Sequence, residues 1–241
     1  MRYAWLYILL LPLYEVCVSQ TPETRARWIP LEEDSIRVEY HLPDTDALRP
    51  VVLVLSDRYG QQANIRATLK VLATLGFRAY SMPLLSAPEQ SFSAIPPAHV
   101  DSSDIQRVLN VAVELMNEDG SNGRLKLLAA DIGANVAMEV VARFPFFKGA
   151  ALFYPAGGVK ALKRLLDARC PLILHVAQYD PDCTLADVNV LREEFMERGK
   201  KLQVYYYKDS RRFFFNPEHP DYHSKNTQSA WTQLHQFFRQ P

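Results

Sequence analysis

Short apolar segments alternate with segments of helical periodicity along most of this chain. Val51–Leu55 (VVLVL) is a continuous β-branched run, which is typical of a strand buried on both faces of a sheet. Asn64–Leu75 follows with helical spacing and ends before Gly76, a residue common at helix C-termini. Strands that alternate with helices in this way form right-handed βαβ units. The sequence therefore predicts an α/β fold with a mostly parallel sheet covered by helices on both faces.

The same alternation predicts the remaining elements. Further strands are expected at Ile36–Leu42 (an edge strand), Phe77–Met82, Leu125–Ala130, Ala150–Tyr154, Pro171–Ala177 and Leu202–Tyr207. Further helices are expected at residues 101–117, Ile132–Phe144, Gly158–Leu166, Thr184–Arg198 and Lys225–Arg239.

The composition fits one globular domain without a strong charge preference. The chain has 241 residues, 48% of them hydrophobic, which is enough for one sizeable core. Lysine plus arginine and aspartate plus glutamate balance at 27 each, so no overall field favours a polyanionic partner. These observations argue against a nucleic-acid-binding function.

The first residues have the layout of a secretory signal. Met1 and Arg2 give a positive start, Ala4–Tyr14 is apolar but too short to span a bilayer, and Cys17–Ser19 offers small residues for cleavage. We predict a signal peptide over residues 1–19, an irregular lead-in over 20–34 and one domain over 35–241. A secreted or periplasmic protein without a stable membrane span follows from this prediction. An uncleaved anchor or a buried first strand is the alternative.

Asp131 lies where a predicted strand turns directly into a helix. The segment Leu127–Asn135 (LLAADIGAN) has the layout small-x-Asp-x-Gly, with Ala129 at the first small position. This resembles the G-x-S-x-G turn that presents the nucleophile in α/β hydrolases. Such a turn lies at the carboxyl ends of the strands, where open α/β sheets bind ligands. Taken alone, the pattern also fits an aspartate that only caps the helix.

Four segments in order resemble the dienelactone hydrolase family of α/β hydrolases, over most of residues 50–238. The first corresponds to the family's first core strand, with an acidic residue before an aromatic residue and glycine. The second corresponds to the end of the next helix and the strand after it. The third corresponds to the strand that carries the triad acid, and the fourth to the closing strand, the histidine loop and the last helix. In this chain they are Val51–Gly60, Leu72–Leu85, His175–Cys183 and Val204–Phe238. The resemblance implies an α/β-hydrolase fold.

The resemblance also locates a candidate site. It places the three triad positions at Asp131, Asp180 and Arg212, with Arg211 as the alternative if the loop shifts by one residue. Predicted binding positions are Asp57, Arg58 and Tyr59 after the first core strand, and Ile132 directly after Asp131. No metal and no cofactor is implied.

The departures from the family pattern decide the expected function. Family members carry cysteine or serine where this chain has Asp131, and histidine where it has Arg212; the family's usual glutamate is Asp57 here. A carboxylate can act as a nucleophile, but the resulting ester must be hydrolysed by water that a base activates. Arginine stays protonated and cannot be that base. It can instead form a charge-assisted pair with Asp131 and Asp180.

We therefore expect a non-catalytic family member, a pseudoenzyme, that binds a small-molecule ligand or a partner at the former active-site cleft. The alternative is an active hydrolase that acts on a small ester, lactone or halide through Asp131. His219 and His223, with Asp221 between them, are interpreted as loop residues rather than as a replacement base or a metal site. The sequence does not predict the oligomeric state.

Overall fold

The computed structural model describes residues 24–31, 34–44, 49–60, 63–85, 100–117 and 124–240. The predicted signal peptide at residues 1–19 lies outside these described residues. No helix within them is long and apolar enough to cross a membrane.

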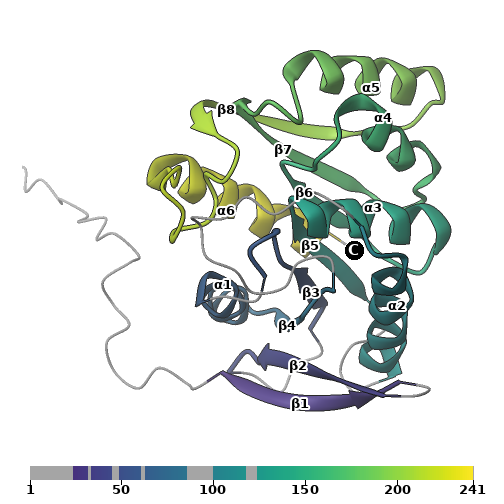
Figure 1. Cartoon of the computed structure of the whole chain (residues 1–241), viewed down its shortest axis with the longest axis vertical. Coiled ribbons are helices and arrows are strands. Elements are labelled where there is room, and N and C mark those ends of the chain that lie inside the picture. Colours follow the sequence, from purple (N-terminus) through teal and green to yellow (C-terminus); the bar gives the residue numbers. More distant parts are fainter. Residues whose placement is uncertain are drawn as a thin grey trace, which may run out of the picture.

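The described residues form one eight-stranded sheet in the order β1-β2-β4-β3-β5-β6-β7-β8 (Figure 1). The strands are β1 (Arg25–Pro30), β2 (Ser35–His41), β3 (Val51–Leu55), β4 (Arg78–Met82), β5 (Leu125–Ala130), β6 (Ala150–Phe153), β7 (Leu172–Tyr179) and β8 (Gln203–Arg211). β1 and β2 pair antiparallel, as do β2 and β4, whereas every pair from β4 to β8 is parallel. The expected mostly parallel sheet is confirmed.

Helices cover both faces of this sheet. They are α1 (Ala63–Thr74), α2 (Ser102–Asn117), α3 (Ile132–Arg143), α4 (Gly158–Leu162), α5 (Leu185–Glu197) and α6 (Ser224–Arg239), with a 3₁₀ turn η1 (Lys163–Asp167) after α4. One apolar core joins the sheet to α2, α3, α4, η1 and α5, and the other joins it to α1 and α6. Figure 1 shows α1 and α6 on the opposite side of the sheet from α2 and α3.

The structure corrects two predictions at the beginning of the domain. The segment 20–34, predicted to be irregular, contains β1, which pairs with β2 from Arg25 opposite Tyr40 to Pro30 opposite Ser35. The predicted edge strand, β2, therefore lies second in the sheet. Ile29 explains why β1 docks, because its side chain is 2% exposed and belongs to the core beneath α2 and α3.

The turn between β5 and α3 is held in a strained, tightly packed form. Asp131 has φ 52°, a left-handed conformation that non-glycine residues rarely adopt. A Cβ on Gly133 would lie 2.3 Å from the carbonyl oxygen of Ser56, so only glycine fits there. The close approach brings the start of α3 against the residues that follow β3. This places Asp131 directly opposite the loop that carries Asp57 and Arg58.

Candidate functional site

Asp131 is fully buried, and Arg58 donates hydrogen bonds to both oxygens of its carboxylate. The Nε of Arg58 donates to Oδ2 of Asp131 at 2.5 Å, and Nη2 donates to Oδ1 at 2.7 Å. The backbone N–H of Arg58 also donates to Oδ2, at 3.1 Å. Paired donors from one guanidinium are the strong, directional form of an arginine–carboxylate contact. The Asp131 side chain makes no capping hydrogen bond to α3, so the capping alternative does not describe it.

Arg212, the first residue after β8, bridges two of the predicted site carboxylates. Its Nη2 donates to Oδ1 of Asp131 at 2.5 Å, and its Nη1 donates to Oδ1 of Asp180 at 2.7 Å. Asp182 approaches the same Nη1 at 3.3 Å. Arg211 is exposed and lies within β8, so Arg212 is the arginine that faces the site. We call Arg58, Asp131, Asp180, Asp182 and Arg212 the ion cluster.

Asp180 is fixed by its own turn at the end of β7. Its Oδ1 accepts the backbone N–H groups of Asp182 at 2.9 Å and Cys183 at 3.3 Å. The Asp-Pro-Asp sequence thus orients one carboxylate inward and leaves the other, Asp182, 44% exposed at the rim. Asp182 was not among the predicted site residues. The sequence signal that could have identified Asp182 is its position two residues after Asp180.

The two carboxylates that Arg212 bridges have shifted pKa values. Burial by itself would raise the pKa of Asp131, but the Arg58 hydrogen bonds and the charges of both arginines outweigh it and hold that pKa below its usual range. Burial raises the pKa of Asp180, and Arg212 opposes the rise. The pKa of Arg212 is raised because the neighbouring carboxylates more than offset its burial. Asp131 is therefore a carboxylate at neutral pH.

Aromatic rings line the side of the ion cluster that faces the loop after β8. The guanidinium carbons of Arg58 and Arg212 each lie 5.8 Å from the ring centre of Phe213, and that of Arg212 lies 6.0 Å from Tyr154. These separations fit cation–π contacts. Tyr59, a predicted binding residue, packs edge-on against Phe213 and is 3% exposed.

Asp57 lies behind the cluster and has a different environment. Its Oδ1 accepts the N–H of Tyr59 and its Oδ2 accepts Nδ2 of Asn216, each at 3.1 Å. Burial raises the pKa of Asp57 to about 7, and the nearby charge of Asp131 adds to the rise. Ile132, the remaining predicted binding residue, is fully buried in the core below α3.

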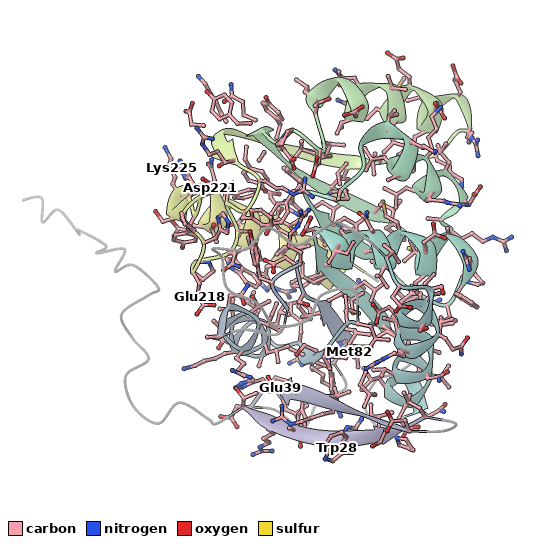
Figure 2. All side chains as sticks on the ribbon, in the orientation of Figure 1. Trp28, Glu39, Met82, Glu218, Asp221 and Lys225 are labelled. Carbon is pink, nitrogen blue, oxygen red and sulfur yellow. The ribbon has the colours of Figure 1, made fainter. Side chains whose placement is uncertain are left out.

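The loop after β8 is tied to the other side of the site. Oε2 of Glu218 accepts the backbone N–H of Asn64 at 3.1 Å, so the loop also caps the first turn of α1. Figure 2 shows Glu218 near α1, with Asp221 and Lys225 closer to the beginning of α6. Together with the Asn216–Asp57 contact, this bond holds Phe213 and Arg212 in place.

No histidine of the described residues takes the place of the missing base. His219 packs against Tyr59 and Phe213, and its Nδ1 accepts the N–H of Asp221. His223 caps α6 through Asn226. His175 is fully buried in β7, with Nδ1 2.7 Å from the Tyr207 hydroxyl. Within the described residues, no group of three or more His, Cys, Asp or Glu side chains could hold a metal ion.

The arrangement opposes acyl transfer at this turn. In α/β hydrolases, an N–H from the loop after the first core strand helps to bind the oxyanion of the intermediate. The corresponding N–H here, that of Arg58, is already bound to Asp131. The nucleophile position carries a permanent charge whose two oxygens both accept guanidinium donors. The cluster can hold charge and position loops, and no histidine of the described residues forms a hydrogen bond with Asp131.

Replacing Asp131 by asparagine should destabilise the protein strongly. Two buried guanidinium groups would lose their shared counter-charge, which costs about 3–5 kcal/mol of unfolding free energy. Asp182→Asn is the matched control, because Asp182 is 44% exposed and its removal should cost less than about 1 kcal/mol. Urea unfolding of the three proteins measures both values. Equal, small losses for the two variants would contradict a cluster centred on Asp131.

Asp57 should make the stability depend on pH. Its folded pKa of about 7 lies above the ordinary 3.8, so the folded protein keeps this proton while the unfolded chain has lost it. Its favourable contribution is complete below the unfolded pKa and is lost as pH rises through the folded pKa. The unfolding free energy of the wild type, relative to Asp57→Asn, should fall by about 2 kcal/mol between pH 5 and pH 7. The histidines contribute equally to both proteins, so their contributions cancel in this difference. A difference in unfolding free energy that does not change between pH 5 and pH 7 would contradict the burial of Asp57 in its uncharged form.

Comparisons with known proteins identify the fold and the family of this chain. An Escherichia coli protein described as "Putative carboxymethylenebutenolidase" is 22% identical over 230 residues, covering 88% of this chain and 85% of its own. The crystal structure of a "Putative Dienelactone Hydrolase" from Klebsiella pneumoniae has a TM-score of 0.80 at 16% identity, covering 91% and 99% of the two chains. A dienelactone hydrolase-like promiscuous phosphotriesterase from metagenomic libraries has a TM-score of 0.76 at 16% identity, covering 90% and 97%.

These likenesses establish the α/β-hydrolase fold. The family model described as "Dienelactone hydrolase family" matches residues 38–241, which include β3, the Asp131 turn, the Asp180 turn and Arg212. The chain belongs to the dienelactone hydrolase family of the α/β-hydrolase superfamily.

Proposed function

We propose that this chain is a non-catalytic member of its family, in which an ion cluster replaces the catalytic triad. The observation that carries the proposal is the state of the Asp131 carboxylate. Both of its oxygens accept donors from Arg58 and Arg212, and its side chain has no exposed surface. A nucleophile needs a free lone pair directed at the substrate. Here the lone pairs are directed at two cations instead.

Binding, rather than turnover, is the role we assign to the former active-site cleft. Arg58 and Arg212 are 9% and 8% exposed, so a ligand would meet the cluster mainly through Asp182. The cluster holds two arginines and three aspartates, which gives it a surplus of negative charge. A ligand or partner with a cationic group would therefore be favoured at this rim.

The competing function is an active hydrolase on a small ester, lactone or halide. The names of the related proteins describe hydrolases, and a carboxylate can displace a halide. The resulting ester at Asp131 would need a base within reach of its water. Arg212 occupies the position of that base, and it cannot activate water because its guanidinium remains protonated.

An assay of turnover separates the two functions. We expect the wild type to hydrolyse p-nitrophenyl acetate and chloroacetate no faster than buffer. The double variant Asp131→Cys, Arg212→His restores the residues typical of the family and should hydrolyse p-nitrophenyl acetate at least about 10²-fold faster than the wild type. The single variant Arg212→His, which keeps the Asp131 carboxylate bound to Arg58, is the matched control and should hydrolyse p-nitrophenyl acetate no faster than the wild type.

Wild-type turnover that disappears in Asp131→Ala would contradict the proposal. Circular dichroism and urea unfolding of each variant must accompany the assay, since loss of the cluster destabilises the fold. A folded but inactive double variant would instead indicate that Arg58 alone blocks the turn between β5 and α3. The triple variant that adds Arg58→Leu tests this directly.

A further inference from the structure

A cavity separate from the ion cluster lies on the α1 and α6 side of the sheet. It has a volume of about 30 Å³ and is bounded by the ends of β3, β5 and β6, the first turns of α1 and the loop after β8. This volume accommodates one or two molecules of the size of water. The residues around it that matter here are Asp57, Asn64, Phe153, Tyr154, Phe215 and Asn216.

Two of the polar groups that line the cavity can accept further hydrogen bonds. Asn64 is 7% exposed, and its Oδ1 accepts no hydrogen bond from any described residue. Asp57 is 2% exposed, and its two hydrogen-bond donors, the backbone of Tyr59 and the side chain of Asn216, are both uncharged amides. Arg58, the nearest arginine in sequence, directs its guanidinium to Asp131 and Asp182. Within the described residues, no cationic side chain forms an ion pair with Asp57.

A buried carboxylate without a counter-charge and a buried amide oxygen without a donor are both unfavourable. One molecule in the cavity would relieve both if it carried a positive charge and several hydrogens to donate. Nδ2 of Asn216 donates to Asp57 and makes no hydrogen bond to Oδ1 of Asn64.

Aromatic rings complete the lining. Phe153 and Phe215 stack with ring centres 4.2 Å apart, and Tyr154 follows Phe153 at the end of β6. Phe153 also stacks on His175, with ring centres 4.0 Å apart, so its faces are occupied and these rings supply an apolar wall. The lining therefore combines anionic, amide and aromatic groups, and it contains no lysine or arginine.

We propose that this cavity binds a small protonated amine, ammonium or methylammonium, between Asp57 and Asn64. Its size excludes larger amines. A hard metal cation takes six or more oxygen ligands, which is more than the carboxylate and amide side chains of this lining supply. At pH 8 the carboxyl group of Asp57 is largely ionised, because burial raises its pKa only to about 7. The proposal is independent of whether Asp131 supports turnover.

Thermal unfolding at pH 8 and constant ionic strength tests the proposal. We expect 100 mM ammonium chloride or methylammonium chloride to raise the Tm by about 2–4 °C over 100 mM sodium chloride. Tetramethylammonium chloride, which is too large and donates no hydrogen bond, should match sodium. Asp57→Asn and Asn64→Ala should both lose the ammonium effect. Asp167→Asn, at an exposed residue that does not line the cavity, is the matched control and should keep it.

Direct observation of the ligand covers the case in which a variant fails to fold. With ¹⁵N-ammonium, a bound resonance with contacts to the Phe153 and Phe215 ring protons is expected in NMR spectra of the wild type. An equal rise of Tm in potassium chloride would overturn the amine assignment. An unchanged Tm in ammonium, an undiminished effect in Asp57→Asn, or water alone in the cavity of a structure determined in ammonium would overturn the proposal.

Discussion

One buried carboxylate, that of Asp131, sets the arrangement of the whole site. The strained turn after β5 directs it into the protein, where Arg58 and Arg212 supply the positive charge that a buried carboxylate requires. Arg212 in turn reaches Asp180, so the ends of four strands, β3, β5, β7 and β8, are joined through Asp131 and Arg212. The same contacts fix the loops after β3 and β8. Removal of a buried member of this cluster would leave another buried charge unpaired, whereas the exposed Asp182 contributes little.

The fold was largely predictable because strand and helix periodicities differ and most elements are long. The range Leu125–Ala130 was predicted to the residue, since an apolar run meets a helix start directly after it. β1 was missed because a short strand with two arginines among its six residues has little apolar pattern. Its burial depends on pairing with β2, and local sequence does not contain that information.

The site was only partly predictable, and the reason is that its contacts are remote in sequence. Family resemblance suggested Asp131, Asp180 and Arg212, and the structure brings these three side chains together. Arg58 was predicted to be a binding residue near the site. Its bidentate contact with Asp131, 73 positions away, depends on side-chain geometry that the sequence does not show. The cavity beside Asp57 was not predicted, because packing alone determines such a space.

The central claim is that Asp131 is a structural anion and not a nucleophile. The most direct measurement is to incubate the wild-type protein with chloroacetate in ¹⁸O-enriched water, and then to determine the mass of the peptide that contains Asp131. An ester formed at this carboxylate would be hydrolysed with solvent oxygen, leaving heavy oxygen in the side chain. We predict a peptide of unchanged mass. Incorporation of ¹⁸O at Asp131 that depends on substrate would contradict the account.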